Sequence, residues 1–378
     1  MTPPRRRALV ATASVLAAVI FIGAWGILAS TNGPEPSPSP RSPSPIPSPS
    51  PTPTPVPTPV PTPTPAPAVI RCPLSGLPVS DPTVTYRKPL LVQIENNPDA
   101  RPPANLAAAD LVLEAPVEGD VTRYSAVFLC QPTVGWTGPI RSARYNNIDF
   151  WQDLHVLTVG FGASLGALDR FAEVGMPYVN GLYGQWPWFA RGDGYAPHNL
   201  YGDLESLRAA LGHDDALDAL AAQVGTLRPP VQFDPAAQLP GRGPVHEVTI
   251  QTNDFWVFGW QWNVPLAAWQ RIDGGEPLSD RALGVPITAH AVIVQRVAQD
   301  IVYGDPDPGG NPRRYQYLVG SGDATLFVDS RAVALTWSRP TAGDKTTFTV
   351  AETGAELVLR PGVVWWEVVP YDAAVTYR

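Results

Sequence analysis

The first 67 residues constrain this chain most, because their composition is typical of a targeting segment and a spacer rather than of a globular core. Residues 5–7 are all arginine and precede an uncharged apolar run at 9–28. A helix over that run, at about 1.5 Å per residue, would span roughly 30 Å, the thickness of a bilayer core. No comparable basic cluster follows, so the positive-inside rule predicts a cytoplasmic N-terminus and an exported remainder. We predict an uncleaved signal anchor in residues 1–30, inserted through 9–28, and a cleaved signal peptide is the alternative.

Residues 31–70 are rich in proline, serine and threonine. Between 34 and 67 nearly every second residue is proline, and its ring removes the backbone donor that a helix or sheet ladder needs. In polyproline II geometry, at about 3.1 Å per residue, this segment would reach on the order of 100 Å. We therefore predict a linker that holds the rest of the chain away from the membrane.

The rest of the chain has the apolar content of a globular protein and is long enough for two domains, which we predict at 71–228 and 229–378. The chain has a formal net charge of −8, and no basic stretch follows the arginines at its start. A surface for nucleic-acid phosphates is therefore not expected. Cys72 and Cys130 are the two cysteines, and export favours a disulfide between them, with two buried thiols as the alternative.

Hydrophobic patterning divides the chain into a mixed first half and a β-rich second half. The pattern predicts strands at 90–94 and 155–161, a hairpin from 110–117 and 121–130, and helices at 142–154, 167–174 and 200–224. After residues 228–230 short β-type runs dominate, separated by Gly, Asp and Pro turns. The expected fold is α+β, with an N-terminal mixed α/β domain and a sandwich- or barrel-like β-rich domain.

Several short motifs occur in one order and resemble the YerB-like lipoproteins. They are residues 94–98 (IENNP), 100–102 (ARP), 109–112 (ADLV), 118–123 (EGDVTR), 138–144 (GPIRSAR), 196–200 (APHNL), 320–322 (GSG), 361–365 (PGVVW) and 368–370 (VVP). The resemblance covers the chain from Cys72 to its end and implies a two-domain extracytoplasmic envelope protein, without implying a reaction. The chain departs from the family in having no cysteine directly after the apolar run, and in carrying Asp120 and Asn97 where the family usually has glycine and often has histidine.

Three arginines in these motifs are candidates for anion binding. Arg141 and Arg144 are three positions apart, and if Ser142 caps the following helix, both lie at its positive N-terminal end. Such a pair, with Arg123 nearby, predicts a site for a carboxylate or phosphate. The alternative is that Arg123 and Arg141 form a buried ion network with glutamates of the predicted hairpin.

His198 is the candidate acid–base group, because imidazole titrates near neutral pH and this one lies in a polar, Gly-rich loop. Asn199 follows it and is assigned to the ligand site. Glu118 or Glu114 would be the second acid–base group, with Glu95 also nearby; in the alternative, Glu114 and Glu118 pair with the arginines. A histidine that only bonds to backbone at a helix start is equally compatible with the pattern.

The segment 160–166 (GFGASLG) lies between a predicted strand and a predicted helix. Its glycine spacing does not fit a dinucleotide-binding turn. It matches Gly-x-Ser-x-Gly, and Ser164 followed by Asp193 and His198 gives an acceptable order for a serine hydrolase. We favour a backbone cradle for an anion, in which Ser164 takes part, with a plain tight turn as the alternative.

No metal or cofactor is expected. The histidines at 155, 213, 246 and 290 lack paired ligand spacing, and neither cysteine has a partner at the spacing of a zinc site. Residues 305–310 lack the regular acidic spacing of a calcium loop and are expected to form a turn.

Together these features predict a single-pass protein of the cell membrane, with its bulk outside the cytoplasm, that binds an anionic ligand associated with the envelope. A hydrolase or transferase on a phosphorylated or carboxylated glycan is one alternative, and a scaffold that binds envelope proteins is another. Trp256, Trp260 and Trp262 alternate in register, so on a strand they would share one face, either stacked on sugars or packed in the core.

Overall fold

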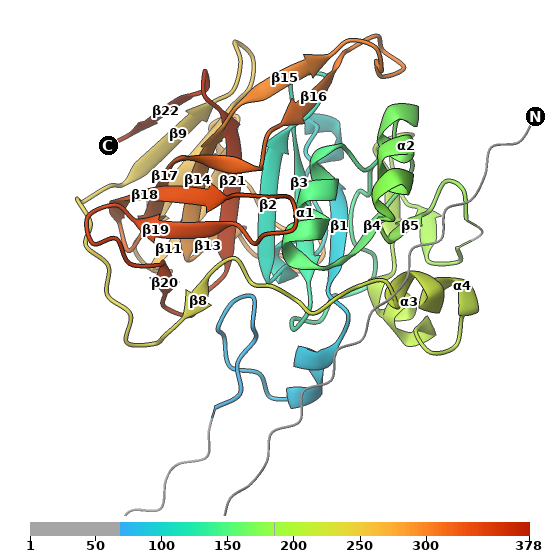
Figure 1. Ribbon diagram of the computed structural model, residues 1–378, viewed down its shortest axis with the longest axis horizontal. Helices are drawn as coiled ribbons and strands as arrows, with labels where there is room; N and C mark the ends of the chain where they lie inside the picture. Colours follow the sequence, from blue (N-terminus) through green and yellow to red (C-terminus); the bar gives the residue numbers. More distant parts are fainter. Residues whose placement is uncertain (1–68, 185) are drawn as a thin grey trace, which may run out of the picture. The chain divides into compact units, whose positions relative to one another are not determined.

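The computed structural model describes residues 69–378 apart from residue 185 (Figure 1). The predicted span at 9–28 and most of the predicted linker lie outside the described residues. Among the residues described, no helix is long and apolar enough to cross a membrane. The sheets, cores and disulfide below all lie within 69–378, so this part contains what it needs to fold on its own.

The fold is α+β and is dominated by one large mixed sheet of ten strands (Figure 1). Its order is β19-β18-β17-β14-β21-β2-β3-β1-β4-β5. The first half of the chain contributes β1 (Leu90–Glu95), β2 (Leu111–Pro116), β3 (Thr122–Phe128), β4 (Leu157–Gly160) and β5 (Tyr178–Asn180). β2 and β3 form the predicted antiparallel hairpin, whereas β1, β4 and β5 run parallel. Every residue of β1, β2 and β3 is buried, as expected for strands of a sheet that is covered on both faces.

The second half contributes β14 (Ala291–Val297), β17 (Gly320–Val328), β18 (Arg331–Arg339), β19 (Thr347–Val350) and β21 (Val364–Pro370) to the same sheet. The two halves join where β2 pairs with β21 in parallel, with Leu111 opposite Val364. Strands from both sides of the predicted boundary at 228/229 therefore hydrogen-bond to each other.

A smaller sheet of six strands packs against one face of the large sheet. It contains β9 (Glu247–Gln251), β10 (Val257–Asn263), β11 (Ala268–Asp273), β12 (Glu276–Pro277), β13 (Thr288–Ala289) and β22 (Ala374–Tyr377). The core between the sheets contains Val92 and Val292 of the large sheet and Trp260 and Trp269 of the small one. Trp260 is fully buried and Trp262 is partly buried, so the tryptophan row of β10 belongs to the core.

Short helices flank the large sheet (Figure 1): α1 (Asn146–Leu154), α2 (Leu165–Val174), α3 (Leu204–Ala210) and α4 (Asp215–Ala221). On the face opposite the small sheet, Phe150 and Leu154 of α1 pack in a second core with Trp366 of β21. The helix predicted at 200–224 is two helices, because Gly212 between them adopts φ +83°, a conformation that interrupts a right-handed helix. The helix predicted at 142–154 begins only at residue 146.

Three small strand pairs and three 3-10 turns complete the fold of the described residues. The long hairpin of β15 (Gln299–Val302) and β16 (Arg313–Gln316) projects beside the loops near α2 (Figure 1). The other pairs are β6 (Phe189–Arg191) with β7 (Leu200–Gly202), and β8 (Gln232–Phe233) with β20 (Val358–Leu359). The turns are η1 (Pro82–Tyr86), η2 (Pro98–Ala100) and η3 (Leu106–Ala108).

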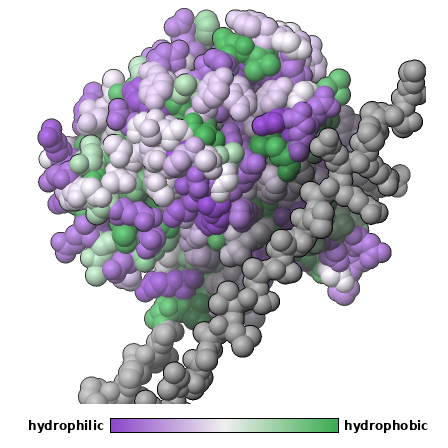
Figure 2. Space-filling view, viewed as in Figure 1, coloured by the Kyte–Doolittle hydropathy of each residue, from purple (hydrophilic) through white to green (hydrophobic). Residues whose placement is uncertain are grey.

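Cys72 and Cys130 form the predicted disulfide, with their Cα atoms 6.0 Å apart. The bond ties the turn at the start of the described chain to the residues that follow β3. On the face shown in Figure 2, hydrophilic and hydrophobic residues are intermixed, as is usual for a protein surface.

Candidate functional site

The carboxyl ends of the parallel strands β1 and β4 position the main polar cluster. The chain segment at 139–141 pairs with β1 beyond the point where β4 ends: the Glu95 amide donates to the Pro139 carbonyl and the Arg141 amide to the Gln93 carbonyl, each at 2.9 Å. The Phe161 amide, just after β4, donates to the Arg141 carbonyl at 3.0 Å. Ligand sites in such sheets lie outside the carboxyl ends of parallel strands.

Glu95, Arg123, Arg141 and His198 meet at this edge, and we call them the Glu95 cluster. Oε1 of Glu95 lies 3.0 Å from Nδ1 of His198 and 3.3 Å from Nε of Arg141. Glu95 and Arg123 are directly opposed across the β1–β3 pair. One carboxylate thus faces two guanidinium groups and an imidazole, so the cluster carries a net positive charge.

Three polar atoms of the Glu95 cluster are buried without a hydrogen-bond partner: Oε2 of Glu95 and the Nε atoms of Arg123 and Arg141. Buried polar atoms in folded proteins are nearly always bonded to protein, water or a ligand. Arg123 donates one bond, to the Ser142 carbonyl at 2.8 Å. Burial, and next the like charge of Arg141, lower the pKa of Arg123 to about 9, opposed by the Glu95 carboxylate.

Solvent reaches the Glu95 cluster from the side of Arg141 and His198, whose side chains are 23% and 16% exposed, against 4% for Glu95. A carboxylate can only accept, so a hydrogen bond between these two groups requires Nδ1 of His198 to donate. In that tautomer Nε2 is the nitrogen left to act as an acceptor. The ring of Tyr195 packs edge-on against His198 at 5.3 Å between centroids.

Asn199 holds the loop that carries His198. Its side-chain nitrogen donates to the carbonyls of Gly192 at 3.0 Å and Gly194 at 3.2 Å, and its oxygen accepts from Arg191 at 2.9 Å. These hydrogen bonds all join residues 191–199, at the end of β6 and in the following loop, which favours a positioning role over the ligand contact predicted from sequence.

Arg144 lies in a different ion network from Arg141. It bonds bidentately to Glu118, which also forms an ion pair with Arg313 at 2.7 Å. Ser142 does not cap a helix: its hydroxyl donates to the Phe161 carbonyl at 2.9 Å. The expected pair of arginines at one helix end is therefore not present, and two arginines hold the Glu118 carboxylate, which argues against its predicted acid–base role.

Ser164 caps helix α2, accepting from the Ala167 amide at 3.2 Å, and donates to Asp305 in the β15–β16 loop. Asp305 also accepts from the Tyr145 hydroxyl at 2.7 Å. Burial, then the bond to Asp305, raises the pKa of Tyr145 to about 12. Within the described residues, Ser164 forms no hydrogen-bonded triad with Asp193 and His198. Its hydroxyl instead bonds to Asp305, which connects the two halves of the chain.

A second buried network was not found from the sequence, and it joins the two sheets. Arg271 of β11 is fully buried and donates to Glu114 at 2.6 Å, to Glu367 at 2.9 Å and to Asp273 at 3.1 Å. Burial, and next the charge of Glu114, raise the pKa of Glu367 well above its usual range, opposed by Arg271. The alternation of Trp269, Arg271 and Asp273 along β11 was the available signal, because it places the arginine on the core face.

These features define an α+β protein whose halves share one sheet and whose polar cluster lies at the carboxyl ends of parallel strands. Residues 74–217 match the family described as "Protein of unknown function (DUF3048) N-terminal domain", and residues 246–366 match its C-terminal domain. The chain belongs to this YerB-like family.

The chain is similar to the YerB protein of Bacillus subtilis both in sequence and in structure. The curated "Putative lipoprotein YerB" of strain 168 is 27% identical over 311 residues, which cover 81% of this chain and 88% of the relative. The crystal structure of the YerB protein is 25% identical, with a TM-score of 0.66, and the match covers 81% of this chain and 99% of that one.

Proposed function

We propose that this chain is a membrane-anchored extracytoplasmic protein that binds an anionic envelope ligand, bearing phosphate or carboxylate, at the Glu95 cluster. The observation that carries the proposal is that three buried polar atoms, on Glu95, Arg123 and Arg141, have no hydrogen-bond partner. Nε of Arg141 has only its ion-pair contact with Oε1 of Glu95 at 3.3 Å. A ligand oxyanion accepts from guanidinium groups, and a ligand hydroxyl donates to a carboxylate. A phosphorylated or carboxylated sugar carries both kinds of group.

The location outside the cytoplasm rests on the apolar run at 9–28, the disulfide and the name of the curated relative. Both cysteines of this sequence are joined to each other, so neither thiol is free to carry a lipid. We therefore assign the anchoring to the apolar run.

A hydrolase or transferase acting on such a glycan is the second candidate, and one observation favours it. Nδ1 of His198 faces the buried Glu95 carboxylate at 3.0 Å, an arrangement that orients an imidazole so that Nε2 can take a proton. In this reading His198 is the base, Glu95 orients it, and Arg141 holds the anionic group. Glu114 and Glu118 are not needed.

Thermal unfolding of residues 69–378 with a panel of small molecules tests the proposal. The panel pairs sugar phosphates and uronic acids with the neutral sugars, and adds muropeptides. A ligand that binds the folded state stabilises it by RT ln(1 + L/Kd), where L is the free ligand concentration, so the melting temperature rises with ligand concentration and affinity. We expect anionic members to raise it and neutral sugars to leave it unchanged; equal shifts with both, or none, would reject the anion site. Release of sugar or phosphate from a binding member would favour the enzyme.

A further inference from the structure

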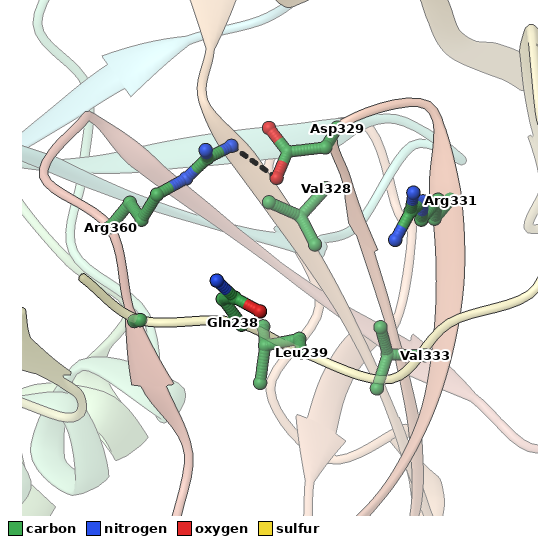
Figure 3. Close-up of a pocket in the computed structure, with 8 residues that line it drawn as sticks. Gln238, Leu239, Val328, Asp329, Arg331, Val333 and Arg360 are labelled. Carbon is green, nitrogen blue, oxygen red and sulfur yellow. Dashed lines mark ion pairs between the residues drawn. The ribbon is translucent and has the colours of Figure 1, made fainter. Parts of the chain in front are cut away.

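Two pockets outside the Glu95 cluster differ in how their charges are paired. The pocket in Figure 3 has a volume of about 470 Å³, and its Arg360 forms an ion pair with Asp329 above the side chains of Leu239 and Val333. The carboxylate balances that guanidinium group, whereas Arg331 of the same pocket has no ion-pair partner among the described residues. The second pocket, of about 580 Å³, carries arginines that have no such partner.

Three chain segments form this second pocket: the turn at 71–76 next to the disulfide, the connection at 228–233, and Lys345. Nη1 of Arg71 donates to the Gly76 carbonyl at 3.0 Å, and Nη1 of Arg228 donates to the Gly343 carbonyl at 2.7 Å. These bonds fix each guanidinium group and leave its other N–H groups free. Neither arginine has an ion-pair partner among residues 69–184 and 186–378, whereas Lys345 pairs with Glu356 at 3.2 Å.

The remaining wall of the pocket is mainly apolar, with Pro73, Val231 and Phe233 among its residues. Phe233 packs directly over Gly76, where a Cβ atom would lie 2.5 Å from the Cβ of Phe233. Gly76 also adopts φ +66°, so both the backbone conformation and the close approach require glycine. The apolar wall therefore packs directly against the turn that carries Arg71.

We propose that this pocket binds a small single-chain amphiphile whose head is a carboxylate or phosphate. The head bonds to the free N–H groups of Arg71 and Arg228, and the apolar chain packs on Pro73, Val231 and Phe233. The volume and the few polar groups in an apolar wall are typical of small-molecule sites. A cationic pocket in a chain of net charge −8 favours an anionic occupant. No residue is shared with the Glu95 cluster, so either proposal can fail alone.

Calorimetric titration of residues 69–378 with octanoate and octyl phosphate, both below their micelle concentrations, tests this site. Acetate and octanol are the controls, because the first lacks the apolar chain and the second lacks the charge. We expect octanoate or octyl phosphate to bind at least about tenfold more tightly than either control, and the tighter of the two identifies the head group. Octanol binding as tightly as both, or no binding by either anion, would overturn the proposal.

Substitutions of the pocket arginines test whether the amphiphile binds in this pocket. Arg228→Gln should weaken it by about tenfold or more, whereas Arg228→Lys, which keeps the charge, should restore part of it. Arg331→Gln changes an exposed arginine of the Figure 3 pocket and should have no effect. Wild-type affinity in a correctly folded Arg228→Gln/Arg71→Gln variant would contradict the assignment. If that double variant does not fold, wild-type affinity in Arg228→Gln alone would contradict it.

Discussion

Nδ1 of His198 lies 3.0 Å from Oε1 of Glu95, although the two residues are 103 positions apart in the chain. The histidine lies in the loop between β6 and β7, and the glutamate is the last residue of β1. Both belong to the half of the chain that matches the N-terminal family domain, so the Glu95 cluster is complete within that half.

Replacing Glu95 by Gln should destabilise the fold, because Arg123 and Arg141 would lose the carboxylate between them. We expect the free energy of unfolding to fall by about 1 to 3 kcal/mol, measured by urea denaturation. Glu173→Gln is the matched control: Glu173 pairs with Arg170 at the surface, with side chains 63% and 51% exposed, and such pairs contribute little. Equal effects of the two substitutions would contradict a buried charge cluster.

Arg271→Met should be more damaging, because it leaves Glu114, Glu367 and Asp273 without their common cation. We expect a loss of about 3 to 5 kcal/mol in the free energy of unfolding, again from urea denaturation. Arg378→Met breaks a pair with Glu247 in which the arginine is 83% exposed, and should cost less than about 1 kcal/mol. A small effect at Arg271 would show that the two sheets do not depend on this network.

Asp149 of α1 gives a pH-dependent prediction. Burial raises the pKa of Asp149 from 3.8 to about 6, so the folded state holds this proton more tightly than the unfolded state does. Its contribution therefore makes stability fall as pH rises from about 4 to 6, and remain lower above that range. Asp149→Asn should remove this slope and stabilise the protein at pH 8 by about 1 to 3 kcal/mol. Urea denaturation of both proteins at pH 4, 6 and 8 checks this; a variant less stable at pH 8 would contradict it.

The disulfide between Cys72 and Cys130 closes a loop with a sequence separation of 58. Reducing it should lower the free energy of unfolding by up to about 4 kcal/mol, because the unfolded chain gains freedom. Thermal unfolding with and without dithiothreitol measures the effect, and the Cys72→Ser/Cys130→Ser variant should show no response to the reductant. An unchanged melting temperature in reduced wild-type protein would contradict a stabilising role.

The sequence predicted the elements whose signal is local. The β2–β3 hairpin and helix α2 lie where the hydrophobic pattern and turns indicated, and the two cysteines pair as expected. The parallel pairing of β2 with β21 could not be predicted in this way, because it depends on contacts between segments about 250 residues apart.

The sequence indicated part of what the structure brings together in the Glu95 cluster. His198 and Arg141 were identified, and they meet at one carboxylate. The glutamate beside His198 is Glu95, whereas Glu118 and Glu114 are bound by other arginines. Spacing alone could not show that Arg141 pairs with β1 before helix α1 begins, which separates it from Arg144. Nor could it show that Asp305 reaches Ser164 from the other half of the chain.

The most direct test of the account is a calorimetric titration of residues 69–378 with the sugar phosphate that gives the largest thermal shift, in wild type, Arg141→Gln and Arg314→Gln. The two arginines have almost the same side-chain exposure, 23% and 22%, but Arg314 pairs with Asp120 away from the Glu95 cluster. We predict that Arg141→Gln raises Kd by about tenfold or more and that Arg314→Gln leaves it within about twofold. Equal affinities in all three proteins would show that the ligand does not bind at the Glu95 cluster.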